Sequence, residues 1–196
     1  MNLPNRLTVS RFILTVAFLV VVFIEFPYHD TAALTLFVIA SITDWMDGAI
    51  ARSRNLITNF GKLMDPLADK ILVCSAFIAF VGHGWIAAWI AVVIVARELA
   101  ITGLRLLAAS KNVVLAAEGW GKHKTIWQMI TIIAVLVRVS YGEWGAFGHA
   151  VFGFSVMGQP WVVPFAALST WLTVALTFIS GWLYLWRNRE LYLRDM

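Results

Sequence analysis

The sequence predicts an all-α polytopic membrane protein with six transmembrane helices, cytoplasmic N- and C-termini, and a polar active-site cavity at the cytoplasmic leaflet. Of the 196 residues, 61% are hydrophobic and only 13% are charged, which is too little polar surface for a water-soluble domain of this size. Several uncharged apolar runs approach the roughly 20 residues that a helix needs to cross a bilayer. The Lys and Arg residues gather in alternate connections between these runs, as they do in helical membrane proteins.

The apolar runs place the six helices in order along the chain. They predict spans at 8–27, 31–52, 63–82, 85–109, 124–141 and 161–186. The first run is read as a retained helix, because no A-x-A-like cleavage site follows it. A Gly-rich stretch, 142–160, falls on the outer side, and its conformation is left open. No linker or composition shift divides residues 1–196, so we expect one membrane domain.

The basic residues decide the orientation. An even number of helices puts both termini on one side, and 14 of the 15 Lys and Arg residues then share that side, with Arg138 as the exception. Loops rich in Lys and Arg remain in the cytoplasm. The net charge of +4 therefore reflects this topology and an anionic membrane surface, not a nucleic-acid partner.

Several charges lie unusually deep along the predicted helices. Asp44 lies 14 residues from Asp30 at the outer start of the second helix, and Asp69 and Arg97 each lie 14 residues from His83 in the tight turn between the third and fourth. At 1.5 Å per residue these charges share one level, about 21 Å below the outer surface. A charge facing lipid at that depth costs at least about 3 kcal/mol. We therefore expect a shared polar chamber, open to the cytosol and lined mainly by helices two to five.

Four aspartates within this chamber predict a metal site. Asp44 and Asp47 are three residues apart and Asp65 and Asp69 are four apart, so each pair shares a helix face; Pro66 suits the first turn of the third helix. Four carboxylates at close range cannot all stay ionised unless cations neutralise them. Oxygen ligands favour Mg²⁺, Mn²⁺ or Ca²⁺, and two such ions form a clamp for in-line displacement at phosphorus. A lone aspartate would instead suit helix pairing or proton relay.

The aspartates are part of a longer pattern, Asp44-x2-Asp47-Gly48-x2-Ala51-Arg52-x8-Gly61-x3-Asp65-x3-Asp69. This pattern resembles the signature of the CDP-alcohol phosphotransferase family at every fixed position. The resemblance implies six helices, a homodimer, a cytosol-facing site, and a reaction in which an alcohol displaces CMP from a CDP-linked substrate.

The same resemblance implies roles for individual residues. Asp44, Asp47 and Asp65 bind two divalent cations, Mg²⁺ or Mn²⁺, and Asp69 completes the metal shell and acts as the base on the acceptor hydroxyl. The residues implied to hold the CDP group are Gly48, Ala51, Arg52 and Gly61, joined through the opening "PNRLTVSR" by Asn5, Thr8 and Arg11.

The acceptor is indicated by a set of basic residues on helices four and five, Arg97, Arg105, Lys122 and Lys124. Such a pocket suits a phosphorylated acceptor, although cytoplasmic Lys and Arg also contact anionic headgroups. The stretches "ARELAITGLRLLAA" and "EGWGKHKT" resemble the branch of the family whose acceptor is sn-glycerol 3-phosphate.

That branch implies a phosphatidyltransferase in a bacterial cytoplasmic membrane, with its active site facing the cytoplasm and membrane lipids around it. Its reaction converts CDP-diacylglycerol and glycerol 3-phosphate into phosphatidylglycerophosphate and CMP. Two alternatives keep the family and change the acceptor, to inositol phosphate or to phosphatidylglycerol as in a cardiolipin synthase. A cation transporter is a more remote alternative, since the polar groups gather at one level and form no path across the membrane.

Overall fold

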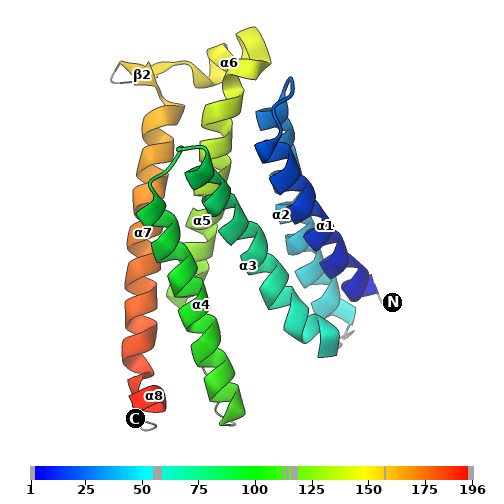
Figure 1. The fold of residues 1–196 in the computed structure, drawn as a ribbon, viewed down its shortest axis with the longest axis vertical. Helices are drawn as coiled ribbons and strands as arrows, with labels where there is room; N and C mark the ends of the chain where they lie inside the picture. Colours follow the sequence, from blue (N-terminus) through cyan, green and yellow to red (C-terminus); the bar gives the residue numbers. More distant parts are fainter. Residues whose placement is uncertain are drawn as a thin grey trace.

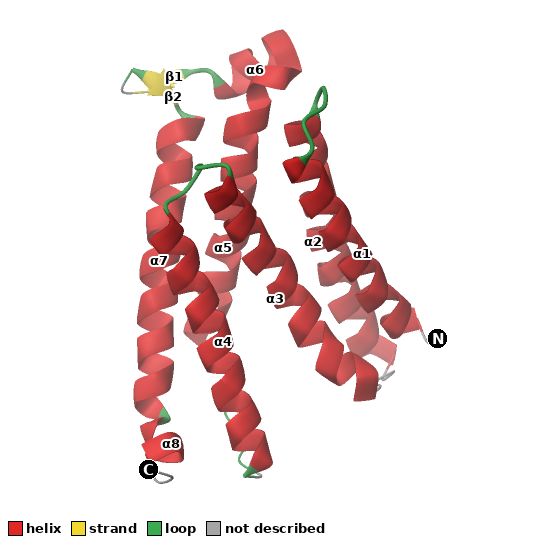
Figure 2. Cartoon of the chain, in the orientation of Figure 1, coloured by secondary structure: helices red, strands yellow, loops and turns green. Residues whose placement is uncertain are grey.

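The computed structural model is a bundle of long helices with most of its short elements at one end (Figures 1 and 2). It describes the backbone of residues 3–54, 59–111, 113, 115, 119–156 and 158–193, and the side chains of 9–43, 67, 70–111, 113, 115, 123–156 and 158–192. The long helices are α1 (Leu3–Phe23), α2 (His29–Arg54), α3 (Asn59–Gly82), α4 (Ala88–Ser110), α5 (Gly119–Ser140) and α7 (Val162–Arg187). The short elements are η1 (Tyr141–Trp144), α6 (Gly145–Phe152), the antiparallel strands β1 (Ser155–Val156) and β2 (Gln159–Pro160), and α8 (Arg189–Leu193).

Each of the six predicted spans is a helix, which confirms a mostly helical chain. The bounds differ most at the starts of α1 and α5, which both begin five residues before the predicted positions. The start of α3 at Asn59 also makes one prediction wrong, because Pro66 falls inside the helix and not in its first turn. An interior proline removes one backbone hydrogen bond from its helix.

The helices pack around a core of aromatic and branched side chains. Helix α1 contacts α2 and α3, α5 contacts α2, α3 and α7, and α4 packs mainly against α7 and α3. Phe18, Phe37, Phe77, Phe80 and Ile94 are fully buried at these contacts. Between helices in a membrane, close van der Waals packing of such side chains stabilises the arrangement, so these residues hold the helix arrangement that positions the polar groups.

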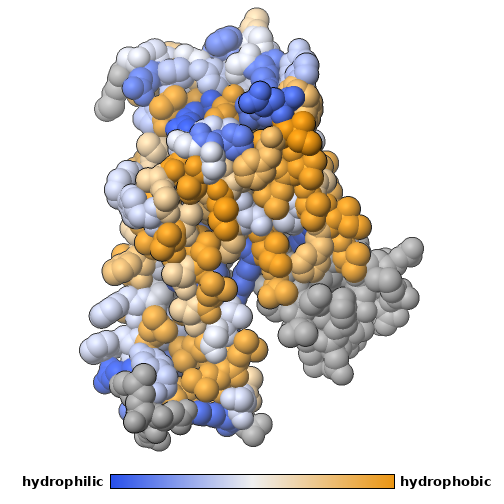
Figure 3. All heavy atoms as spheres, in the orientation of Figure 1, coloured by the Kyte–Doolittle hydropathy of each residue, from blue (hydrophilic) through white to orange (hydrophobic). Residues whose placement is uncertain are grey.

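On the face seen in Figure 3, hydrophobic residues cover much of the middle of the bundle, and hydrophilic residues gather mainly toward its two ends. Ile13, Val92, Leu99, Trp171 and Phe178 are all exposed. Two helical stretches in the described part of the chain, His123–Phe152 and Val162–Arg187, are long and apolar enough to cross a membrane. Shorter apolar stretches occur at Val9–Phe23, His29–Thr43 and Lys70–Gly82. Length and apolarity agree with a helical membrane protein.

The two ends of the bundle differ. At one end, η1, α6 and the β1–β2 hairpin form a cap, which settles the conformation of 142–160. The Glu143 carboxylate accepts hydrogen bonds from the Thr31 backbone N–H (2.9 Å) and hydroxyl, and the Trp144 indole N–H donates to the Thr31 hydroxyl (2.8 Å). These bonds tie η1 to the start of α2. Gly84, with φ +69°, makes the tight turn from α3 to α4 at this end.

At the opposite end the helices splay apart. Helices α3 and α4 diverge from their shared turn, and α1 begins and α8 ends toward this splayed end (Figure 1). Figure 3 shows hydrophilic side chains within the hollow between the two diverging halves of the bundle. This is the end toward which the predicted polar chamber opens.

Candidate active site

The predicted aspartates lie on two consecutive helices at the splayed end. Asp44 and Asp47 belong to the C-terminal half of α2, and Asp65 and Asp69 belong to the N-terminal half of α3. Their side chains lie outside the described set. The same holds for Asn5, Thr8, Gly48, Ala51, Arg52, Gly61 and Lys122. The helix–connection–helix arrangement is confirmed, and the metal, base and CDP roles of these residues stay predictions.

The structure brings together two of the predicted acceptor residues, Arg97 and Lys124, through a glutamate. Lys124 Nζ on α5 donates to Glu98 Oε1 on α4 in a close ion pair, and Arg97 Nη1 lies 3.4 Å from the same oxygen. Glu98 is 5% exposed and Lys124 is 4% exposed. Hydrogen bonds between oppositely charged groups are strong in such buried places. One carboxylate oxygen therefore contacts both cations.

A second polar contact connects this cluster to α3. Lys70 Nζ donates to the Thr102 hydroxyl, which in turn donates to the Glu98 backbone carbonyl at 2.6 Å. Lys70 directly follows Asp69 in the sequence. Lys70 is one of the 14 basic residues predicted on the cytoplasmic side and was not among the predicted site residues. The spacing of Glu98 and Thr102, four apart on one helix face, is the signal that marks a polar stripe on α4.

Arg97 occupies a restricted position between α4 and α7. Its Cγ lies 2.9 Å from where a Cβ would stand on Gly181, so the absence of a side chain there makes room for the arginine stem. Arg97 Nε is buried and has no hydrogen-bond partner among the described residues. Arg97, Thr177 and Gly181 help to line a cavity of about 330 Å³ whose other walls are apolar. A buried N–H of a cation without an acceptor is costly, so this group is suited to receive an anion.

The other two predicted site residues whose side chains are described are Arg105 and Arg11. Arg105 is exposed; its Nε donates to the Tyr184 hydroxyl at 3.3 Å and its guanidinium lies 5.7 Å from that ring centroid. It follows Glu98 by seven residues on the same face of α4, about 10 Å nearer the splayed end. Arg11 is buried in α1, where its carbonyl accepts a hydrogen bond from the Thr15 hydroxyl at 2.8 Å.

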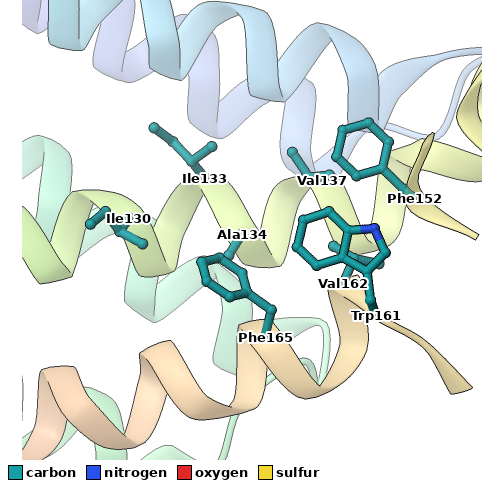
Figure 4. A pocket seen from close by; sticks show the side chains of 8 residues that line it. All are labelled: Ile130, Ile133, Ala134, Val137, Phe152, Trp161, Val162 and Phe165. Carbon is teal, nitrogen blue, oxygen red and sulfur yellow. The ribbon is translucent and has the colours of Figure 1, made fainter. Parts of the chain in front are cut away.

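Two features at the capped end are separate from this cluster. A cavity of about 230 Å³ between α5, α6 and α7 is lined only by apolar and aromatic side chains, including the stacked Phe152 and Trp161 (Figure 4). His29, Asp30 and Glu143 place potential ligand atoms within 4.8 Å of one another. Glu143 already accepts hydrogen bonds from the first turn of α2, which gives this group a structural role in the cap.

Similarity to known proteins identifies the family of this chain. Residues 1–179 match the model of the CDP-alcohol phosphatidyltransferase family. The chain is 40% identical to the CDP-diacylglycerol--glycerol-3-phosphate 3-phosphatidyltransferase of Bacillus subtilis (strain 168), with 96% of each chain covered. Proteins of the same name from Rickettsia bellii (33% identical, 93% of each chain) and Mycoplasma pneumoniae (32% identical, 82% of this chain and 79% of the relative) are also similar. This chain belongs to the CDP-alcohol phosphatidyltransferase family.

Proposed function

We propose that this protein is a phosphatidylglycerophosphate synthase, which transfers the phosphatidyl group of CDP-diacylglycerol to sn-glycerol 3-phosphate and releases CMP. Its relatives from three bacterial genera carry the name of that activity. The structural observation that supports the proposal most is the excess of positive charge around Glu98. Arg97 and Lys124 share this one carboxylate. The Lys70 ammonium of α3 contacts Thr102, which lies one turn beyond Glu98 on α4. A buried excess of cations is stabilised by an anion, and the phosphate of the acceptor supplies one.

The proposed reaction is a single displacement at phosphorus. The Asp69 carboxylate takes the proton of the glycerol 1-hydroxyl, and the hydroxyl oxygen attacks the phosphorus that bears diacylglycerol. The bond from that phosphorus to the bridging oxygen breaks, and its electron pair leaves with CMP. Arg97 and Lys124 hold the acceptor phosphate so that the hydroxyl faces the phosphorus. Orientation of this kind lowers the barrier by removing the entropy cost of a chance encounter.

The donor set around Asp69 fits divalent cations. Asp44, Asp47 and Asp65, together with Asp69, offer only carboxylate oxygens, which Mg²⁺ and Mn²⁺ prefer. The antiparallel course of α2 and α3 puts both aspartate pairs at the same end of the bundle. Two bound cations would neutralise the diphosphate and the departing CMP. The CDP group itself is assigned to Asn5, Thr8, Arg11, Gly48, Ala51, Arg52 and Gly61.

The proposal includes a topology for the enzyme. Six spans, with the splayed end facing the cytoplasm of a bacterial inner membrane, put 14 of 15 basic residues on the inner side. CDP-diacylglycerol then reaches the site with its acyl chains still in the leaflet, and the water-soluble acceptor enters from the cytosol. We also propose that the enzyme acts as a homodimer, as the family resemblance implies.

One assay tests the function. Purified protein in liposomes receives CDP-diacylglycerol, Mg²⁺ or Mn²⁺, and one acceptor at a time, and both CMP and the lipid product are measured. We expect CMP release and phosphatidylglycerophosphate only with glycerol 3-phosphate. Product only with inositol phosphate or with phosphatidylglycerol would replace the acceptor assignment, and no CMP with any acceptor would refute the enzyme.

Replacement of Arg97 tests the acceptor pocket. Arg97→Ala removes a cation that faces the acceptor phosphate, and a hydrogen bond to a charged group contributes about 1.5–3 kcal/mol. The KM for glycerol 3-phosphate is expected to rise about 10- to 100-fold, while the KM for CDP-diacylglycerol stays within about twofold. Arg189→Ala, at an exposed position on α8, is the control. An unchanged KM for the acceptor would place Arg97 outside the pocket.

Gly181 provides a separate test, because it touches Arg97 and no substrate. Gly181→Ala puts a methyl group 2.9 Å from Arg97 Cγ, so the arginine stem must move; such overpacking costs about 1–3 kcal/mol. We expect a KM for glycerol 3-phosphate several-fold higher than that of the wild type. The matched control is Gly103→Ala on α4, where the new Cβ has no described atom within 4 Å apart from its chain neighbours and the nearby backbone of its own helix. Equal KM values for the two variants would show that the stem position is unimportant.

A further inference from the structure

Glu98 is a negative charge in a pocket that is proposed to bind an anion. It is 5% exposed and belongs to α4, next to Arg97 and across from Lys124 on α5. A fixed carboxylate repels a nearby phosphate, and the repulsion is stronger away from bulk water. A pocket built only to attract the acceptor would therefore be better without Glu98.

The contacts of Glu98 show what its charge does. Its Oε1 accepts from Lys124 Nζ and lies 3.4 Å from Arg97 Nη1, so the carboxylate stands between two cations that would otherwise repel each other. Helix α4 packs mainly against α7 and α3, and the Glu98–Lys124 pair is therefore a bridge that ties α5 to α4. The two cations are brought to one place by their shared partner.

The same residue is also connected to the helix that carries the aspartates. The Glu98 backbone carbonyl accepts from the Thr102 hydroxyl, which accepts from Lys70 Nζ on α3. Lys70 is the residue after Asp69. These two hydrogen bonds therefore connect Glu98, the shared partner of Arg97 and Lys124, to the turn of α3 that bears the proposed base.

We infer that Glu98 is a positioning residue for the acceptor, holding Lys124 and Arg97 side by side at a fixed place relative to α3 so that both cations grip one phosphate. This inference rests on the proposed function. Glu98 does not touch the substrate; it acts through Lys124 and Arg97. Its removal should therefore weaken binding of the phosphorylated acceptor and leave binding of the CDP-linked lipid unchanged.

The test is a double-mutant cycle on the full-length enzyme in liposomes, with Glu98→Gln, Lys124→Met and the double variant. Glu98→Gln is expected to raise the KM for glycerol 3-phosphate about tenfold or more, with the KM for CDP-diacylglycerol within about twofold of wild type. Because Glu98 is inferred to act partly through Lys124, the double variant should have a KM clearly lower than the product of the two single effects predicts. A purely structural role would move both substrates' KM values together.

Two further variants keep the test decisive. Glu98→Asp retains the charge and should recover at least part of the lost affinity, and it serves alone if Glu98→Gln does not fold. Glu25→Gln, at an exposed position after α1, is the control for loss of a carboxylate. An unchanged or lower acceptor KM in Glu98→Gln, or independent effects that multiply in the double variant, would overturn the inference. A wild-type enzyme that ignores glycerol 3-phosphate would instead refute the proposed function.

Discussion

Asp69→Asn is expected to reduce kcat by about 10³-fold, because a positioned general base contributes about 10²- to 10⁴-fold to rate and Asp69 is proposed both to be that base and to complete the metal shell. Asparagine has nearly the same shape and keeps one oxygen ligand, but it cannot take a proton from the acceptor hydroxyl. The KM for CDP-diacylglycerol should therefore change by much less than kcat. Steady-state CMP release with both substrates varied separates the two effects.

The control for this substitution is Asp30→Asn, which makes the same chemical change in the first turn of α2, at the capped end of the bundle. Its kcat should stay within about twofold of wild type, since Asp30 lies outside the proposed site. Near-normal turnover by Asp69→Asn would assign the base to another group. Loss of both lipid binding and turnover would indicate that Asp69 acts as a metal ligand and not as the base.

The sequence predicted the helices well because apolar runs report directly on burial in lipid or in a core. It predicted the ends of helices less well, since the polar first turns of α3 and α5 lie beyond the apolar runs that define a span. Asn59–Lys62 has almost no hydropathy signal, yet α3 begins there. Backbone hydrogen bonding and contacts with neighbouring helices decide such turns, and hydropathy contains neither.

Arg97 and Lys124 were both predicted to belong to the acceptor pocket, and in the structure both contact the carboxylate of Glu98. The depth of these charges in the membrane stays a prediction from the fixed rise of a helix. Their common partner was not predicted. Glu98 and Lys124 are 26 residues apart, and which faces of α4 and α5 meet depends on the packing of every other helix. The Thr31–Glu143 contact, 112 residues apart, was missed for the same reason.

Removal of divalent cations is expected to abolish activity, with a fall of at least about 10³-fold, since metal stabilisation of a transferring phosphoryl group is worth several kcal/mol. Chelation should be reversed by added Mg²⁺ or Mn²⁺. Asp47→Asn should raise the metal concentration needed for half-maximal rate, because one anionic ligand is replaced by a neutral one. Titration of CMP release against each metal, for wild type and variant, measures this shift.

The decisive control for the metal prediction is Glu143→Gln. Among the described residues, Glu143 forms a group of candidate metal ligands with His29 and Asp30 at the capped end, away from the four aspartates. If catalysis uses cations held by the α2 and α3 aspartates, the metal concentration at half-maximal rate should be the same in Glu143→Gln and wild type. A shift in Glu143→Gln with none in Asp47→Asn would indicate that the required metal binds at the capped end of the bundle, which contradicts the prediction. Full activity in chelator would remove metals from the reaction altogether, and would leave no chemical reason for four aspartates to be placed toward the same end of the bundle.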